Sequence, residues 1–297
     1  LPFLLGSLRI FSSGAAIAGW SGLNDIGRSK NLIVTDRDLF PDDSVELENV
    51  RVFGDAERVI SYAGSIMTEA GCSVSPAFGK LMADNNIPTC RIGNFEYLSG
   101  GGMRAIIDGS VVLCGGIELM RLMNIRVPFR LVGENPVLLA IDGKLHGIFN
   151  VKYKAQPQVR KALIKLISSD RHPIFAIRDF NISPAMLAKA FDVATDGYDF
   201  PPYVERFKIS SAAPGEDSQI AAVICREGLG PLTHVADTGR KMYVAVRVNL
   251  AITLVSAILG VLLVFIKLLT AGTVSVAFLL IYMLLSAVLV AVVSVVK

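Results

Sequence analysis

Two long segments near the C-terminal end of the sequence contain no charged residue. One runs from Val248 to Ile266 and the other from Leu268 to Val296, with Lys267 between them. A helix needs roughly 20 predominantly apolar residues to cross the hydrocarbon core of a bilayer, which is about what each segment offers. The segments therefore predict a transmembrane hairpin with its turn at residues 270–273. The alternative, a buried hairpin in a large soluble protein, usually shows a polar stripe along one helix face.

The composition of the whole chain agrees with a membrane protein. Of its 297 residues, 52% are hydrophobic and 19% are charged, whereas soluble domains are about 45–50% apolar and roughly 25% charged. The net charge of +3 is too small and too dispersed to indicate nucleic acid as a partner. The four cysteines are far apart and form no Cys-x-x-Cys pair. They predict neither a zinc site nor a disulfide framework, and they fit a reducing compartment.

Basic residues on either side of the hairpin predict its orientation. Arg240, Lys241 and Arg247 precede the first segment and Lys297 follows the second, whereas the turn has Lys267 alone. Because cytoplasmic loops carry an excess of Lys and Arg, we expect the residues before Arg247 to be cytoplasmic. The predicted location is therefore the cytoplasmic membrane, with the soluble domains in the cytoplasm and the lipid bilayer as a partner.

The part of the chain before the hairpin alternates between strand and helix patterns. The strand patterns cover residues 31–35, 173–178 and 204–209, and the helical patterns cover residues 158–168, 184–191 and 217–225. Strands that alternate with helices predict an α/β layer with a mostly parallel sheet.

A different pattern interrupts this alternation between residues 44 and 135. It has helical stretches at 55–68 and 76–85, followed by apolar strands that meet at Asp108-Gly109 and predict a hairpin. A second hairpin is predicted at Asp142-Gly143. The three glycines from Gly100 to Gly102 could let backbone amides approach a ligand closely, or could form a simple flexible turn.

Acidic residues follow two of the predicted strands. Asp36 comes directly after the strand at 31–35, and Asp179 follows the strand that ends at Arg178. Parallel sheets place chemistry at the carboxyl ends of their strands, so Asp36 is a candidate catalytic residue. Alternatively, Asp36 caps the turn that follows the strand. The pattern alone favours neither interpretation.

Taken in order, these segments resemble the C-terminal half of a P-type cation-transporting ATPase of the heavy-metal branch, over nearly the whole chain. Leu1-Pro2-Phe3 resembles the Cys-Pro-Cys segment of the membrane helix that precedes the phosphorylation domain. Ser73-Val74-Ser75-Pro76 is similar to the Ser-Glu-His-Pro motif of the nucleotide-binding domain. The Gly100–Gly102 turn resembles that domain's Gly-x-Gly hairpin, and the two uncharged segments resemble the family's last pair of spans.

This resemblance implies a haloacid dehalogenase-like (Rossmannoid) α/β phosphorylation domain with an inserted α+β nucleotide-binding domain, plus transmembrane helices. The implied parts are the end of a membrane helix and a linker at 1–23, a phosphorylation-like domain at 24–46 and 136–240, a nucleotide-binding-like domain at 47–135, and the hairpin at 245–297. The implied catalytic residues are Asp36, Asp38 and Asp179. The implied ATP contacts are Ser75, Pro76, Gly100 and Gly102, with ATP and Mg²⁺ as cofactors and no residue assigned as a metal ligand.

The catalytic motifs of the family are altered in this chain. Of the family's Asp-Lys-Thr-Gly-Thr motif, only Asp36 remains, followed by Arg37 and Asp38. The Thr-Gly-Asp loop reads Ile177-Arg178-Asp179, and the acidic magnesium loop has no counterpart at residues 226–230. Phosphoryl transfer depends on neutralising charge with Mg²⁺ and cationic groups, so these changes predict lost catalysis.

The binding motifs are altered as well. Leu1 and Phe3 replace the two metal-binding cysteines, and apolar side chains cannot bind a soft metal ion as thiolates do. Ser75 replaces the adenine-binding histidine.

We therefore expect a membrane-anchored, catalytically degenerate relative of metal cation pumps with nucleotide binding as its retained property. One alternative is a component of an ATP-driven heavy-metal transporter that needs a separate chain with further membrane helices and an actuator domain. Another is a Mg²⁺-dependent haloacid dehalogenase-type phosphatase, with Asp36 as nucleophile and Asp38 as general acid and base.

Overall fold

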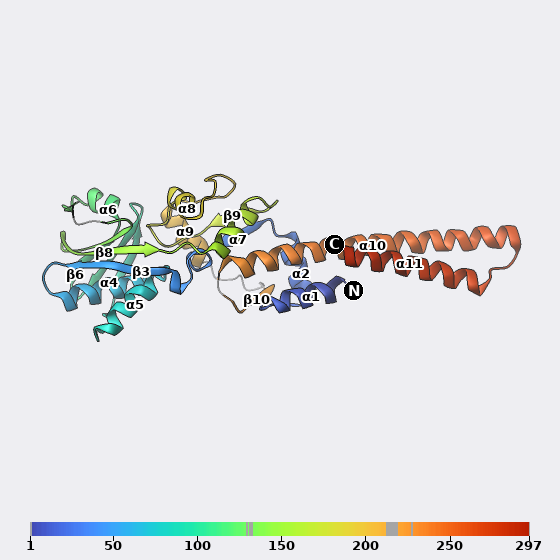
Figure 1. The fold of residues 1–297 in the computed structure, drawn as a ribbon, viewed down its shortest axis with the longest axis horizontal. Helices are drawn as coiled ribbons and strands as arrows, with labels where there is room; N and C mark the ends of the chain where they lie inside the picture. The colour runs from blue at the N-terminus through green and yellow to red at the C-terminus, as the bar shows by residue number, and fades with distance from the viewer. Residues whose placement is uncertain (1, 129, 131–132, 212–218, 227, 297) are drawn as a thin grey trace. The chain divides into compact units, whose positions relative to one another are not determined.

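The computed structural model describes residues 2–128, 130, 133–211, 219–226 and 228–296 (Figure 1). Spatial contacts divide the chain into two compact units. The first unit comprises Leu1–Ser29, Asp217–Arg226 and Pro231–Lys297, and the second comprises Lys30–Glu216 and Glu227–Gly230.

The first unit holds the two long apolar helices and a small base of short elements. These elements are α1 (Pro2–Ser12), β1 (Ala15–Ile17), α2 (Gly19–Arg28), β10 (Ala222–Ile224), α10 (Leu229–Ala271) and α11 (Val276–Val296). Strands β1 and β10 pair in antiparallel fashion, and Ile10, Leu23 and Met242 are buried in one cluster. A Cβ atom on Gly22 would lie 2.2 Å from the carbonyl oxygen of Ala221, so α2 can approach this chain segment only through glycine.

Helices α10 and α11 form the predicted hairpin, with its turn between Ala271 and Val276. Both are long and apolar enough to cross a membrane. Two polar contacts join them: the Asn249 side-chain amide donates to Ser294 Oγ at 2.7 Å, and the Tyr282 hydroxyl donates to the Ser256 carbonyl.

The second unit is built around a six-stranded antiparallel sheet. In spatial order its strands are β3 (Val45–Val52), β8 (Lys144–Tyr153), β7 (Pro136–Ile141), β6 (Ser110–Gly115), β5 (Gly102–Ile107) and β4 (Gly93–Leu98). The two predicted hairpins are confirmed at Asp108-Gly109 and Asp142-Gly143, where both residues of each turn have positive φ, as tight two-residue turns require. The boundary predicted between the nucleotide-binding-like part and the phosphorylation-like part, at residues 135 and 136, falls at the start of β7. This strand pairs with β6 on one side and with β8 on the other, so one sheet includes strands from both sides of that boundary.

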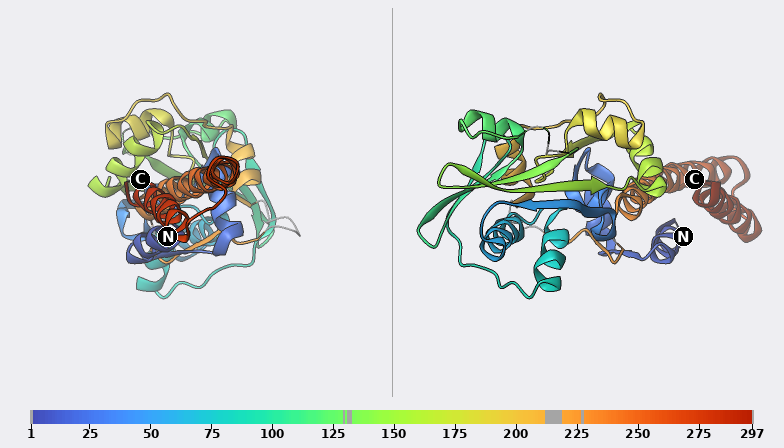
Figure 2. Two further views of the ribbon diagram at one scale, coloured as in Figure 1. Left: turned by 90° about the vertical axis from the view of Figure 1, so that its right-hand side faces the viewer. Right: turned by 60° about the vertical axis from the view of Figure 1, so that its left-hand side comes forward.

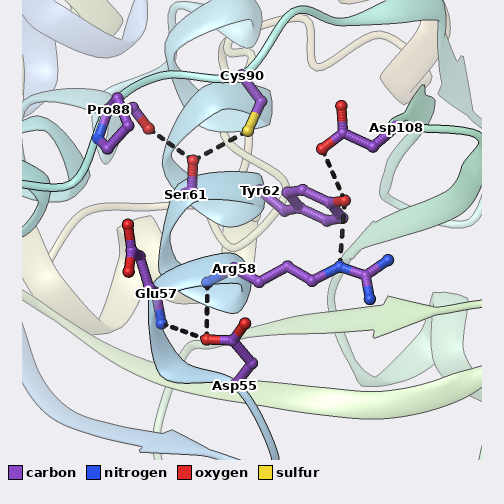
Figure 3. Close-up of a pocket in the computed structure, with 8 residues that line it drawn as sticks. All are labelled: Asp55, Glu57, Arg58, Ser61, Tyr62, Pro88, Cys90 and Asp108. Carbon is purple, nitrogen blue, oxygen red and sulfur yellow. Dashed lines mark hydrogen bonds between the residues drawn. The ribbon is translucent and has the colours of Figure 1, made fainter.

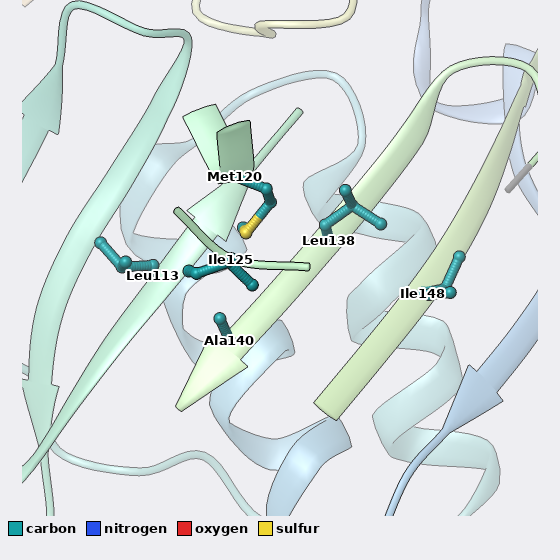
Figure 4. Packing of buried hydrophobic residues seen from close by; sticks show 6 residues of the cluster. All are labelled: Leu113, Met120, Ile125, Leu138, Ala140 and Ile148. Carbon is teal, nitrogen blue, oxygen red and sulfur yellow. The ribbon is translucent and has the colours of Figure 1, made fainter. Parts of the chain in front are cut away.

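Helices cover both faces of this sheet (Figure 2). Helices α4 (Ala56–Ala70) and α5 (Ser75–Asp84) lie on one face, where Phe78 packs on Phe149 with ring centroids 5.0 Å apart. Helix α6 (Ile117–Leu122) covers the other face, where Met120 packs with Ile148 and other buried side chains (Figure 4). The alternation of Ile148 and Phe149 between the two faces follows from the two-residue period of a strand.

The remaining elements of the second unit form a small α/β layer. Strand β2 (Asn31–Val34) pairs in parallel with β9 (His172–Phe175), and four helices accompany them: α3 (Asp36–Leu39), α7 (Pro157–Ile167), α8 (Pro184–Phe191) and α9 (Tyr203–Ser211). A short 3-10 turn, η1 (Asp42–Ser44), leads into β3. The predicted mixed α/β class with two apolar helices is confirmed.

The pairing expected within the α/β layer is confirmed, since β2 pairs in parallel with β9 and a parallel bridge joins Ile174 to Asp199. Two finer expectations were wrong. Residues 204–209 form helix α9 rather than a strand, since Tyr203 and Phe207 are both buried at helical spacing. The described part of the predicted helix at 217–225 contains strand β10 instead.

Candidate functional site

The parallel pairing of β2 and β9 brings Asp36 and Asp179 together at the carboxyl ends of these strands. Asp36 is the first residue of α3 and is 3% exposed. Its Oδ2 accepts a hydrogen bond from the Arg178 backbone N–H at 2.9 Å, and its Oδ1 accepts one from the Asp179 backbone N–H at 2.9 Å. Both oxygens of the predicted nucleophile are therefore held by backbone donors.

Asp179 is equally enclosed, with only 1% of its surface exposed. Its Oδ2 accepts hydrogen bonds from the Tyr153 hydroxyl at 2.6 Å and from Ser73 Oγ at 2.8 Å. Its Oδ1 accepts from the Asn181 backbone N–H at 3.0 Å. The donors come from the end of β8, from the turn between α4 and α5, and from the segment after β9.

Burial changes the protonation of this carboxyl pair. It raises the pKa of Asp36 from 3.8 to about 7, and the negative charge of Asp179 adds to the rise, while the two backbone hydrogen bonds oppose it. Burial also raises the pKa of Asp179, and the bond from Tyr153 opposes that rise. At neutral pH the pair therefore carries less negative charge than two exposed carboxylates would.

A buried cation lies close to the pair. Arg206 of α9 is 7% exposed, and its guanidinium lies 4.6 Å from the ring centroid of Phe200 and 5.0 Å from that of Tyr203. Within the described part of the chain, its Nε and Nη1 atoms have no hydrogen-bond partner. Burial lowers its pKa, while the charges of Asp36 and Asp179 raise it.

Asp38 has a local role. Its Oδ2 accepts hydrogen bonds from the Thr35 backbone N–H and from Thr35 Oγ1, both at 2.8 Å. This is a capping box that begins α3. In the phosphatase alternative Asp38 would be the general acid and base. In this structure its Oδ2 is instead hydrogen-bonded to Thr35 at the start of α3.

The predicted ATP contacts lie on two turns of the second unit. Ser75 and Pro76 begin α5, and the Ser75 hydroxyl donates to the Met67 carbonyl. Gly100 and Gly102 lie at the turn between β4 and β5, where a Cβ on Gly102 would lie 2.5 Å from the Cys114 carbonyl oxygen. In this structure the glycine therefore serves the close packing of strands.

Residues 178–180 touch both of these turns. Arg178 Nη1 donates to the Ala70 carbonyl at 3.4 Å, at the end of α4. A Cβ on Gly101 would lie 3.6 Å from Phe180 Cβ. The segment that follows β9 thus links the predicted catalytic carboxyls to the predicted nucleotide contacts.

The carboxyl pair does not fit a Mg²⁺ ion. Mg²⁺ is held through one or two carboxylates together with phosphates and waters. Asp36 and Asp179 are only 3% and 1% exposed, and each of their oxygens already accepts a hydrogen bond, so the pair leaves little room for a hydrated ion or a phosphate. Among the described residues, no group of three or more His, Cys, Asp or Glu side chains converges as a metal site.

A separate recess of about 470 Å³ lies beside the first turn of α4 (Figure 3). Arg58 Nε donates to the Tyr62 hydroxyl at 3.1 Å, and this hydroxyl donates to Asp108 Oδ2 at 3.0 Å. Ser61 Oγ donates to the Pro88 carbonyl at 2.6 Å. These bonds tie α4 to the β5–β6 turn and leave the main polar groups of the recess paired with one another.

Sequence reasoning missed Ser73, Tyr153 and Arg206, which complete the buried cluster. Only Ser73 stood within a motif singled out from the sequence, and no periodic pattern marked the other two. Two positions of the altered motifs, Leu1 and Glu227, lie outside the described residues.

Comparisons with known proteins point to one group. No family model matches the chain. The manganese-exporting P-type ATPase of Mycobacterium tuberculosis is 29% identical over 119 residues, which cover 37% of this chain and 17% of that protein. The copper-transporting P-type ATPase of Rhizobium leguminosarum is 22% identical over 203 residues, which cover 65% of this chain and 24% of that protein. The chain thus spans a quarter or less of these relatives.

Solved structures give similar names at lower identity. A zinc-transporting PIB-type ATPase in the E2P state is 16% identical with a TM-score of 0.47, covering 99% of this chain and 53% of that one. The catalytic domain of the CPx-ATPase CopB-B is 15% identical with a TM-score of 0.44, covering 69% of this chain and 77% of that one.

Proposed function

We propose that the chain, which is similar in sequence to manganese-, zinc- and copper-transporting P-type ATPases, is a membrane-anchored form of them that has lost aspartyl-phosphate chemistry and binds nucleotide without hydrolysing it. In this proposal α10 and α11 insert into the cytoplasmic membrane, and the second unit lies in the cytoplasm. The sequence supports the insertion through the two uncharged segments and the basic residues that precede them.

The state of Asp36 is the observation that carries the loss of catalysis. A carboxylate that attacks a phosphorus atom must be ionised and open to the substrate. Asp36 is 3% exposed, and burial raises its pKa to about 7, so its carboxyl is enclosed and partly protonated at neutral pH. Backbone N–H groups also hold each of its oxygens in place.

The phosphorylation experiment uses the full chain in membranes, with γ-labelled ATP and Mg²⁺. We expect no label on Asp36, while a metal-exporting relative treated in parallel becomes labelled. A Mg²⁺-dependent label that disappears in Asp36→Asn would contradict the proposed loss of catalysis.

Nucleotide binding needs its own measurement. Calorimetry on the detergent-solubilised full chain, with ATP and with Mg²⁺-ATP, should show saturable binding in the micromolar to millimolar range. Pro76→Ala, Gly100→Ala and the exposed control Arg104→Ala distinguish the predicted contacts from nonspecific binding; a Cβ on Gly100 would meet only the ends of flexible leucine side chains first. Absence of binding up to several millimolar would leave a scaffold role and remove the nucleotide part of the proposal.

A second candidate follows from the names of the relatives, which describe exporters of manganese, zinc and copper. The chain would then act in ATP-driven cation transport together with a separate chain that carries further membrane helices and an actuator domain. Co-reconstitution with such a chain should give metal-stimulated ATP hydrolysis. Unchanged hydrolysis across a series of soft divalent and monovalent metal ions would exclude this candidate.

A further inference from the structure

We propose that the closing segment, defined as residues 178–180 together with helix α9, covers the predicted nucleotide face and must release before a nucleotide can bind. We define the nucleotide face as the elements that adjoin the predicted ATP contacts Ser75, Pro76, Gly100 and Gly102; they are the α4–α5 turn (residues 71–74), strand β4 and the β4–β5 turn (99–101). This inference rests on the proposed nucleotide binding and adds a regulatory step to it.

Hydrogen bonds fasten the closing segment to the α4–α5 turn. Ser73 Oγ donates to Asp179 Oδ2 at 2.8 Å, and Arg178 Nη1 donates to the Ala70 carbonyl at 3.4 Å. A Cβ on Gly71 would lie 3.3 Å from Arg178 Nη1. Ser73 in the turn and Ala70 at the end of α4 are therefore both bonded to the closing segment.

Arg178 also joins the two parts of the closing segment to each other. Its Nε donates to Ser210 Oγ at 2.8 Å, and its Nη2 donates to the Ser210 carbonyl at 3.1 Å and to Ser211 Oγ at 3.0 Å. One guanidinium thus bridges the end of α4 and the end of α9. Movement of α9 away from the sheet would break this set of bonds together.

Aromatic contacts cover the rest of the face. Phe207 of α9 stacks on Tyr97 of β4, with ring centroids 3.3 Å apart and an interplanar angle of 24°. Arg178 lies 5.7 Å from the ring centroid of Phe207, and Phe207 is 4% exposed. At the β4–β5 turn, Phe180 occupies the space beside Gly101.

A planar nucleotide base that packs on β4 would have to displace Phe207. A protein whose binding-competent state is a minor population shows an apparent dissociation constant raised in proportion to that population. Weakening the closing segment should therefore tighten nucleotide binding, even though the substituted residues make no contact with the nucleotide.

Cys72 reports closure independently of any nucleotide. It lies in the α4–α5 turn and is 1% exposed, and burial raises the pKa of its thiol to about 12. A buried thiol with this pKa reacts slowly with a maleimide, since the thiolate is the reactive form. Cys114, which is 0% exposed within the sheet, reports unfolding of the unit. Cys90→Ser and Cys225→Ser remove the two more accessible thiols.

In this background we compare Phe207→Ala, Arg178→Ala and Ser73→Ala with the control Arg104→Ala, whose side chain pairs with Glu96 on the exposed side of the hairpin. Ser73→Ala removes one hydroxyl and serves as the variant least able to disturb folding. Maleimide labelling and ATP binding are measured on the same full-length preparations. The expected result is labelling of Cys72 at least about tenfold faster, with Cys114 unlabelled, and ATP binding about tenfold tighter in the first three variants.

Cys72 labelling that stays at the control rate in all three variants would overturn the closing role and leave the proposed nucleotide binding to its own test. Faster Cys72 labelling with no ATP binding in any protein would overturn both the regulatory step and the proposed nucleotide binding. Faster labelling with ATP affinity unchanged would show that the face opens without controlling the nucleotide, and would overturn the regulatory step alone.

Discussion

Replacing Asp36 with Asn removes the titration of a carboxyl group that folding buries. Burial, with the charge of Asp179 as the second cause, raises the pKa of Asp36 from 3.8 to about 7. One pKa unit corresponds to about 1.4 kcal/mol of differential interaction between the two protonation states. The shift of about three units therefore corresponds to about 4 kcal/mol of pH-dependent folding free energy.

The direction of the effect follows from which state holds the proton more tightly. The folded chain binds this proton more tightly than the unfolded chain, so the stabilisation is fully present below about pH 4. It is lost as the pH rises through the window from about 4 to about 7. In the Asn variant the unfolding free energy is lowered by an amount that does not change with pH, because the side-chain amide places a donor opposite a backbone N–H. The amide has no proton to lose in this pH range.

The assay is urea unfolding of the full chain in detergent micelles, followed by the near-ultraviolet circular dichroism of tyrosines, five of the seven of which lie in the second unit. The free energy of unfolding of the wild type minus that of Asp36→Asn should fall by about 3 kcal/mol between pH 4 and pH 7, because titration is incomplete at both ends of that window. A difference that stays constant, or that grows as the pH rises, would refute the burial argument.

Further predictions follow from single contacts. Tyr153→Phe removes the hydroxyl that donates to a buried carboxylate at 2.6 Å, and it should cost about 1–3 kcal/mol of unfolding free energy in the same urea assay. Gly22→Ala should lower the melting temperature, because its Cβ would lie 2.2 Å from a backbone carbonyl oxygen. Gly79→Ala has open space around the new Cβ, so it should stabilise α5 by up to about 1 kcal/mol. If α10 and α11 insert as proposed, a membrane-impermeant maleimide should label Ser275→Cys from outside intact cells. The same reagent should reach the exposed Cys225 only after lysis. Labelling in the opposite order would reject the orientation.

The elements predicted correctly are those whose signals are local. The Asp108-Gly109 turn needs two residues that tolerate positive φ, and this requirement is visible in the dipeptide itself. Helix α8 (Pro184–Phe191) coincides with the helical pattern predicted at 184–191. Ser183 caps it, because its Oγ accepts from the Met186 backbone N–H at 3.2 Å, and Pro184 suits the first turn.

Part of the candidate site was also predictable, because strand order is encoded in the sequence. Two buried strands that each precede an acid placed Asp36 and Asp179 at one sheet edge, and the parallel pairing of β2 and β9 brings them there. The donors to Asp179 were not predictable in the same way. Tyr153 and Ser73 lie 26 and 106 residues away from it in the sequence, and their hydrogen bonds depend on packing across the whole unit.

Whether Asp36 is a nucleophile or a structural carboxyl depends on which groups bind its two oxygens, and an acid at the end of a parallel strand suits either role. The residues after it favour the structural role that we propose. Leu39 and Phe40 are both 0% exposed, and Phe40 packs against Tyr153 and Phe191 with ring centroids 5.1 and 5.3 Å away. A loop that must wrap around a phosphoryl group needs small or polar residues with free backbone donors, whereas an apolar pair draws the chain into the core. The Leu-Phe pair directly after the acids therefore supports the proposal that Asp36 has a structural role, and this pair is visible in the sequence itself.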